Sequence, residues 1–320
     1  MKLARDGRTL VVPDFLIIGA AKSGTTSLYH YLDQHPDVFF SSGIKEPGYF
    51  CFADRPYRLI ANGLPDLWKT AVTSLDEYLD LFMDAPPHAV VGEATPEYLL
   101  LPDPTIANLA KVYGDDLTRV RFIAVLRNPI DRIWSNYWMM VRDGYENQTF
   151  EVATDPGTIA GRLDRGWHPC YDYRGFGTYG RQLGAYLERL DRNQFRVVLF
   201  EELARDPATV CRELFDFLGV DASLTPYVSV RHNVSVRLKY PRLHHALFGR
   251  DTAPKRLARL LFPTATLQRV KARVIGWNIN KVPMRPEQRL GLAALYEEDI
   301  HRLGSVLGRD LSHWFRGEIA

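Results

Sequence analysis

The segment from Phe15 to Tyr29, FLIIGAAKSGTTSLY, constrains the fold of this chain more than any other stretch. Its first residues form a continuous apolar run, which is typical of a strand that is covered on both faces of a sheet. A loop of glycine and small residues follows, and helical periodicity comes after the loop. This order places backbone N–H groups and a helix N-terminus around an anion. The segment therefore predicts a phosphate-binding loop.

The loop differs from the Walker A sequence, GxxxxGK[ST], in the position of its lysine. In a Walker A loop the lysine follows the second glycine, whereas here Lys22 precedes Gly24 by two residues and Thr25 follows it. Lys22 would still lie over a bound anion as a point charge. The alternative is a tight turn with an exposed lysine, but the hydroxyls that open the helix favour an anion site.

Further apolar runs at 89–92, 120–126 and 195–200 are separated by segments with helical periodicity. This alternation predicts an α/β protein, with a P-loop-type parallel sheet flanked by helices. The helical pattern at the end of the chain predicts a helical C-terminal extension. Helices are expected over 157–165, 179–191, 207–218 and 286–307.

The run VRFIAVL is followed by Arg127, Asn128 and Pro129, and apolar spacing resumes from Ile130. A proline in this position predicts that a helix starts near Pro129. Arg127 would then lie at the carboxyl end of a strand, where ligands bind in open α/β sheets. A kinase would be expected to offer a carboxylate there to hold magnesium.

The stretch from 142 to 180 combines glycine, proline, aspartate and aromatic residues, with weak periodicity outside 157–165. It predicts a long irregular excursion. Loops of this length inside a compact domain are usually functional or disordered, and the density of tryptophan and tyrosine favours an ordered one.

Composition narrows the functional classes. The 320 residues carry a net charge of +2, which argues against a general nucleic-acid binder. No window resembles a secretory signal or a membrane span, which favours a cytoplasmic protein without a transmembrane segment. Cys51, Cys170 and Cys211 lack metal-ligand spacing, so we expect plain thiols and no metal.

The charge is unevenly distributed. The residues from Arg231 to Arg273 include eleven lysines and arginines but only one acid, Asp251. A solvated face and a surface that binds an anion both fit this pattern. Within it, PKRLARLLF predicts an amphipathic helix, which leaves peripheral membrane contact as an alternative to packing against the protein.

Two of these segments resemble a known family. FLIIGAAKSGTTSLYHYLDQHP is similar to the 5′-phosphosulfate-binding motif of sulfotransferases, and VRFIAVLRNPIDRIWSNY to their 3′-phosphate-binding motif. KEPGYF, GEATPEY and the segment from Tyr179 to about Val220 also resemble the heparan-sulfate-type branch and its bacterial relatives. The resemblance implies transfer of a sulfuryl group from 3′-phosphoadenosine-5′-phosphosulfate (PAPS) to a hydroxyl or amine, without a metal. A glycan, a lipid headgroup and a small molecule remain open as acceptors.

The resemblance also implies roles for individual residues. Lys22 would bind the 5′-phosphosulfate and neutralise charge as the S–O bond breaks. Donor contacts are expected from Lys22, Ser23, Gly24, Thr25, Thr26 and Ser27 at the 5′ end, and from Arg127 and Ser135 at the 3′-phosphate. Arg237 and Lys239 would belong to a basic loop that covers the nucleotide. Arg132 is expected to be structural or to support these contacts.

Glu46, in KEPGYF, is the expected general base, because the resemblance places the catalytic glutamate there and a hydroxyl is a poor nucleophile at neutral pH. The alternative is a loop glutamate paired with Lys45. Glu93 is open between an acceptor-site and a structural role. Gly48 and Ala94 stand where glycan-modifying relatives often have histidine and lysine, which puts a heparan-like acceptor in doubt.

The resemblance implies one sulfotransferase domain over 1–320, with a tail at 1–12, an α/β core at 13–225, and the basic loop and terminal helices at 226–320. Two other functions remain open. One is a P-loop kinase that uses ATP and magnesium, and the other is a phosphoadenosine-binding scaffold without turnover. The displaced lysine disfavours the kinase, and the presence of Lys22 together with Glu46 disfavours the scaffold.

Overall fold

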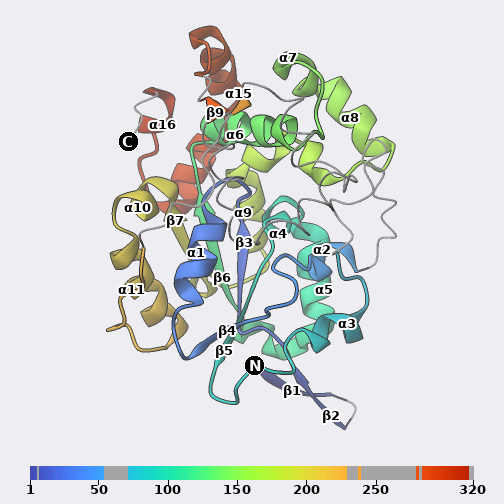
Figure 1. Cartoon of the computed structure of the whole chain (residues 1–320), viewed down its shortest axis with the longest axis vertical. Coiled ribbons are helices and arrows are strands. Elements are labelled where there is room, and N and C mark those ends of the chain that lie inside the picture. Colours follow the sequence, from blue (N-terminus) through green and yellow to red (C-terminus); the bar gives the residue numbers. More distant parts are fainter. Residues whose placement is uncertain (6, 54–70, 229–236, 239–278, 281–282, 317–320) are drawn as a thin grey trace, which may run out of the picture.

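A five-stranded parallel sheet forms the centre of the protein (Figure 1). The computed structural model describes residues 1–5, 7–53, 71–228, 237–238, 279–280 and 283–316. The strand order is β4-β5-β3-β6-β7, so the two strands that carry the proposed donor motifs are neighbours. Their bounds are β3 Phe15–Gly19, β4 Val38–Phe40, β5 Val90–Ala94, β6 Arg121–Leu126 and β7 Phe195–Leu199. The α/β prediction is confirmed.

Helices cover both faces of the sheet, which is why its strands are continuously apolar. Phe15 and Ile17 of β3 belong to one core cluster, and Leu16 and Ile18 to the other. Helices α1 (Thr25–Leu32), α10 (Phe200–Arg205) and α11 (Pro207–Leu218) lie on the left of the sheet in Figure 1. The right side holds α2 (Tyr49–Phe52), α3 (Leu75–Asp80), α4 (Glu97–Leu100) and α5 (Pro102–Tyr113).

The remaining helices pack around the upper part of the sheet in Figure 1. Helix α6 (Pro129–Arg142) begins at the predicted proline, with Asn128 as its N-cap. The C-terminal helix α15 (Pro286–Leu307) has the predicted bounds and is followed by α16 (His313–Arg316). Helix α9 (Tyr179–Leu187) ends earlier than predicted, because Asp191 caps a separate 3-10 turn, η4 (Arg192–Gln194).

The excursion from 142 to 180 is more regular than predicted. It contains α7 (Phe150–Ala153), α8 (Pro156–Asp164) and the short 3-10 turns η2 (Pro169–Tyr171) and η3 (Gly175–Gly177). The side chains of Thr149 and Asp155 cap α7 and α8, which explains why short helices form there. A buried ion pair joins Arg162 to Glu146 at 2.6 Å and holds the segment together.

Residues 1–12, which we expected to form a tail, contain a hairpin of β1 (Lys2–Arg5) and β2 (Arg8–Val11). The terminal amine of Met1 pairs with Asp14 at 2.7 Å, which fixes the hairpin to the start of β3. A 3-10 turn, η1 (Gly114–Arg119), leads into β6, and β8 (Arg237–Leu238) pairs antiparallel with β9 (Ile279–Asn280). The three cysteines are buried thiols, as predicted.

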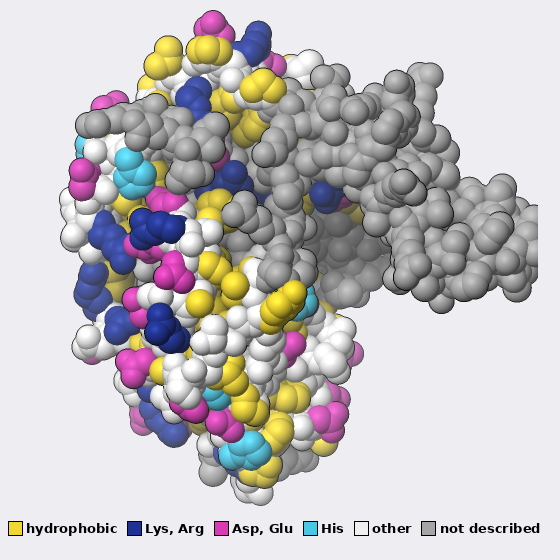
Figure 2. Space-filling model, turned by 60° about the vertical axis from the view of Figure 1, so that its left-hand side comes forward, with side chains coloured by type: hydrophobic (Ala, Val, Ile, Leu, Met, Phe, Trp, Pro, Cys, Tyr) yellow, Lys and Arg dark blue, Asp and Glu magenta, His cyan; other side chains and the backbone are white. Residues whose placement is uncertain are grey.

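The surface mixes charges of both signs. Figure 2 shows lysine and arginine interspersed with aspartate and glutamate over the visible described face, without a large area of one sign. The basic segment from 231 to 273 lies outside the described residues, except Arg237 and Leu238, of which only the backbone in β8 is described. Among the helices that the structure describes, none has the length and apolar character needed to cross a bilayer.

Candidate active site

The loop between β3 and α1 has the backbone geometry of an anion-binding turn. Lys22 has a φ of 68° and Gly24 a φ of 95°, so both lie in the left-handed region. Gly24 is the N-cap of α1, and the first N–H groups of a helix have no acceptor within the helix. Thr25, Thr26 and Ser27 supply hydroxyls at this end of α1. The loop therefore combines free backbone donors with hydroxyl groups, as the sequence predicted.

Two glycines let the loop pack closely against its neighbours. A Cβ on Gly19 would lie 2.8 Å from Cβ of Leu99 in α4, which is too close for any other residue. A Cβ on Gly24 would lie 3.3 Å from the ring of Phe200, at the start of α10. The loop is thus fixed between α4 and α10.

Lys22 points from the loop toward α6. Its ammonium nitrogen lies 3.2 Å from the sulfur of Met139. The pKa of Lys22 is lowered to about 8, mainly by burial and also by the positive charges of Arg142 and Arg127, while Asp143 acts in the opposite direction. A thioether is a weak hydrogen-bond acceptor and provides no negative charge.

Arg127 lies beside Lys22, at the carboxyl end of β6. Its Nη1 donates to the carbonyl oxygen of Lys22 at 3.3 Å. Its guanidinium lies 4.9 Å from the centre of the Phe200 ring, in a cation–π arrangement. Burial lowers the pKa of Arg127. Phe200 therefore supports both the arginine and the loop glycine that it contacts.

Ser135 and Met139 lie on the same face of α6, because they are four positions apart. Met139 contacts Lys22, so this face of α6 is directed toward the loop. Ser135 is buried. The structure thus brings Lys22, Arg127 and Ser135, predicted from two separate motifs, to one end of the parallel sheet. Arg132, on the same helix, is fully buried and donates to the carbonyl oxygen of Tyr173, which gives it a structural contact.

Neither Lys22 nor Arg127 forms an ion pair with a carboxylate among the described residues. Partly buried cations usually have such a partner, because removing a charge from water is costly. Two neighbouring cations with lowered pKa values, and with no carboxylate of the described residues within ion-pair distance, fit an anionic ligand. The residues present therefore suit a phosphate or sulfate group.

Lys45 connects this loop to Glu46. Its ammonium nitrogen lies 3.1 Å from the hydroxyl of Thr26 and 2.5 Å from Oε1 of Glu46. The Glu46 side chain is 34 % exposed, so a molecule in solution can reach it. The ion pair is the one that our alternative interpretation named, and it also places the carboxylate next to the anion-binding loop.

Two further carboxyl groups lie deeper than Glu46. Glu93 accepts hydrogen bonds from the hydroxyls of Tyr78, Thr95 and Tyr98. Burial raises the pKa of Glu93 to about 7. Glu97 is also buried, and its pKa is raised by burial and by the charge of Glu46. Since Glu93 is only 3 % exposed and bound by three hydroxyls, its carboxylate has a structural position.

Sequence reasoning missed several of these contacts. Met139 and Phe200 are ordinary apolar residues in sequence, and only the packing of α6 and α10 brings them to the loop. Thr95 adjoins a residue of GEATPEY that the resemblance named, so its position was a usable signal. The pair of Lys45 with Glu46 was the alternative interpretation, but the contact of Lys45 with Thr26 was not expected. The side chains of Arg237 and Lys239 lie outside the described part of the chain, and their predicted roles stay predictions.

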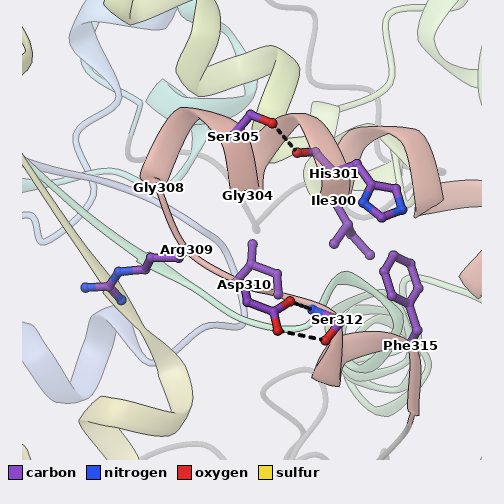
Figure 3. Close-up of a pocket in the computed structure, with 10 residues that line it drawn as sticks. Ile300, His301, Gly304, Ser305, Gly308, Arg309, Asp310, Ser312 and Phe315 are labelled. Carbon is purple, nitrogen blue, oxygen red and sulfur yellow. Dashed lines mark hydrogen bonds between the residues drawn. The ribbon is translucent and has the colours of Figure 1, made fainter.

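A separate hollow of about 360 Å³ lies at the end of α15 (Figure 3). Its polar groups bond to one another: Ser305 donates to the carbonyl oxygen of His301, and Asp310 accepts from Ser312. Arg309 points away from the other labelled side chains and pairs with Glu202 of α10 at 2.9 Å. None of its lining residues belongs to the loop or to the strand ends described above.

Comparison with known proteins connects this geometry to a family. Residues 12–238 match the sequence profile of the Sulfotransferase domain family. The chain is 28 % identical to mouse heparan sulfate glucosamine 3-O-sulfotransferase 3A1 over 225 residues, which are 70 % of this chain and 50 % of the relative. It is also 28 % identical to the bovine bifunctional heparan sulfate N-deacetylase/N-sulfotransferase 2, over 96 % of this chain and 31 % of the relative.

A solved structure gives the same result. The crystal structure of a sulfotransferase from Alicyclobacillus acidocaldarius superposes with a TM-score of 0.72 at 30 % identity, covering 95 % of this chain and 99 % of that one. The chain spans about half the length, or less, of the curated relatives named above. The profile match covers both predicted phosphate-binding motifs, the loop at Lys22 and the strand end at Arg127. The chain belongs to the sulfotransferase family.

Proposed function

We propose that this protein transfers a sulfuryl group from PAPS to a hydroxyl or amine of an acceptor molecule. The observation that carries the proposal is the pair of cations, Lys22 and Arg127, which meet at an anion-binding loop without a carboxylate partner among the described residues. The donor has anionic groups at both ends of its nucleotide. Two sites on adjacent strands of one sheet suit such a molecule.

The proposed donor-binding residues form two groups, one for each anionic end of the donor. Lys22, Gly24, Thr25 and Thr26 would hold the 5′-phosphosulfate through the ammonium, the backbone N–H groups and the hydroxyls. Ser23 and Ser27 belong to the same loop and first helical turn. Arg127 and Ser135 would bind the 3′-phosphate.

Glu46 would act as general base for the acceptor. The acceptor oxygen or nitrogen attacks sulfur, the bond from sulfur to the phosphate oxygen breaks, and 3′,5′-phosphoadenosine (PAP) leaves. The proton lost by the acceptor passes to Glu46, and the positive charge of Lys22 stabilises the negative charge on the departing phosphate. Lys45 contacts both the Thr26 hydroxyl and Glu46, so the base and the donor loop share one cation.

The acceptor class remains a proposal. The relatives named above include enzymes named for heparan sulfate, so we propose a glycan as the first acceptor to examine. Ala94 and Gly48 do not provide charged groups, so smaller and less acidic acceptors belong in the same screen. A cytoplasmic location also stays a prediction.

Calorimetric titration of the protein with PAP, in buffer treated with chelator, tests the donor site. We expect micromolar or tighter binding, and at least a hundredfold loss in Lys22→Ala. Titration with ATP and magnesium is the comparison. Binding of ATP with magnesium but not of PAP would contradict the proposal and favour a kinase. Transfer of ³⁵S from labelled PAPS to heparan sulfate, to a neutral oligosaccharide and to a phenol then separates an enzyme from a binding scaffold.

A further inference from the structure

The segment after Glu46 is held in place by two hydroxyl groups. The backbone N–H of Gly48 donates to Oγ1 of Thr95 at 3.1 Å, and the backbone N–H of Phe50 donates to the hydroxyl of Tyr98 at 3.3 Å. Thr95 directly follows β5, and Tyr98 lies in α4, which packs beside α2 in Figure 1. These contacts fix the backbone within two to four residues of the proposed base.

Both hydroxyls give their own protons to one carboxylate. Oγ1 of Thr95 donates to Oε1 of Glu93 at 2.5 Å, and the hydroxyl of Tyr98 donates to Oε2 at 2.7 Å. The hydroxyl of Tyr78 donates to the same Oε2 at 3.0 Å. A hydroxyl has one proton and two lone pairs. Because each proton points at Glu93, the lone pairs of Thr95 and Tyr98 are left to accept the N–H groups of Gly48 and Phe50.

In its ionised form, which prevails above its pKa of about 7, Glu93 therefore sets the direction of every hydrogen bond in this group. Glu93 is 3 % exposed, Thr95 1 % and Tyr98 0 %, so bulk water cannot substitute for a lost partner. In this low-dielectric environment a hydrogen bond is stronger and an unsatisfied donor is more costly than in water. We call Glu93, Thr95 and Tyr98 the Glu93 brace.

Gly48 is the point where the brace acts on the backbone. Its φ of 69° turns the chain into α2, and a Cβ there would lie 2.6 Å from the ring of Phe52. The residue cannot carry a side chain without a clash. The hydrogen bond from its N–H to Thr95 fixes the backbone two residues after Glu46, and Lys45 links Glu46 to the loop through Thr26.

We propose that the Glu93 brace positions Glu46 for proton transfer, so that Glu93, Thr95 and Tyr98 are positioning residues and do not contact the donor or the acceptor. This inference rests on the proposed function, because it assigns the brace to the residue that serves as base there. A positioning role and a purely stabilising role of the brace have different effects on the kinetics. The brace is expected to act on turnover and to leave donor binding unchanged, since the side-chain hydrogen bonds of Glu93, Thr95 and Tyr98 do not reach Lys22 or Arg127.

Substitution of Thr95 gives a matched test. Thr95→Val removes the hydroxyl and keeps a similar shape, whereas Thr95→Ser keeps the hydroxyl and loses a methyl group. We expect Thr95→Val to lower kcat with labelled PAPS and heparan sulfate about tenfold or more, because small misplacements of a catalytic group have effects of this size or larger. The Kd for PAP should stay within about twofold, and Thr95→Ser should recover most of kcat.

Amide hydrogen exchange provides a second measurement that needs no acceptor. With PAP bound, the amides of Gly48 and Phe50 should exchange faster in Thr95→Val than in the wild type and Thr95→Ser. Unchanged exchange in Thr95→Val would overturn the brace, and so would a kcat in Thr95→Ser that is no higher than in Thr95→Val. If the wild-type protein binds no PAP, the proposed function is overturned. Amide hydrogen exchange of the unliganded proteins would then test the brace independently of that function.

Discussion

The ammonium nitrogen of Lys22 lies 3.2 Å from the sulfur of Met139, so the one lysine of the loop contacts the helix that begins within the second predicted phosphate-binding motif. Lys22 and Met139 are 117 positions apart in sequence. Their contact puts a positive charge with a lowered pKa at the place where the donor's 5′ group is proposed to bind.

The pH dependence of donor binding follows from this lysine. Burial lowers the pKa of Lys22 to about 8 in the absence of ligand, and a bound anion favours the protonated form. Affinity for PAP should therefore fall as the pH rises above about 8, and binding near that pH should take up a proton. Calorimetry in buffers of different ionisation enthalpy measures that uptake. In Lys22→Arg, whose side chain stays charged, proton uptake should disappear, and persistent uptake would assign it to another group.

Arg127 is expected to contribute to binding of the 3′-phosphate. Arg127→Ala should weaken PAP binding by about 2 to 3 kcal/mol, as expected for a lost hydrogen bond between charged groups. Adenosine 5′-phosphosulfate lacks the 3′-phosphate and is the matched ligand. Its affinity should change much less in the variant. An equal loss for both ligands would mean that Arg127 acts by holding the loop through the Lys22 carbonyl.

Support of Arg127 by the Phe200 ring can be tested separately. Phe200→Leu keeps an apolar residue but removes the cation–π contact, which is 4.9 Å from guanidinium to ring centre. We expect about 0.5 to 1 kcal/mol weaker PAP binding. Leu203→Ile, at a neighbouring position of α10 that also contacts the loop, is the control for general packing. Equal effects of both changes would indicate packing alone.

Glu46→Gln should lower turnover on the order of a hundredfold, because an amide cannot accept the acceptor's proton. Binding of PAP should remain close to the wild-type value. Lys45→Gln is the companion variant, since it removes the cation that contacts both Thr26 and Glu46. Turnover in Glu46→Gln at the wild-type level would remove Glu46 from the mechanism.

Glu93 should make stability depend on pH. Burial raises its pKa in the folded protein from an ordinary value near 4.5 to about 7. Between pH 4.5 and 7 the folded state keeps a proton on Glu93 that the unfolded state has released. The stabilisation from Glu93 is therefore fully present below pH 4.5 and is lost as the pH rises through 7. Relative to Glu93→Gln, the wild type should lose about 3 kcal/mol of unfolding free energy between pH 4.5 and 7.5.

Denaturant unfolding of the two proteins at both pH values measures this difference. The remaining titratable groups around the position, Glu46, Glu97, Tyr78, Tyr98 and Tyr113, are shared by both proteins and largely cancel. A difference that does not change with pH would mean that Glu93 is ionised in the folded state throughout this range.

Much of the sheet was predictable, because strands covered on both faces need continuous apolar runs. The runs at β3, β5, β6 and β7 were identified on that basis. Strand β4, Val38–Phe40, was missed because three residues are too short for a pattern. The hairpin at the amino terminus was also missed, and the pairing of Met1 with Asp14 that joins it to the start of β3 is not revealed by strand patterns.

The sequence by itself determined the glycine-rich loop after β3, the strand-end position of Arg127 and the start of α6, because glycine, proline and apolar periodicity act through local backbone geometry. Only the tertiary structure decided how these parts serve one another. The contact of Lys22 with Met139, the ring of Phe200 under Arg127 and the hydroxyls around Glu93 join distant segments. Burial then sets the pKa values, since it depends on what packs around a group and not on its neighbours in the chain.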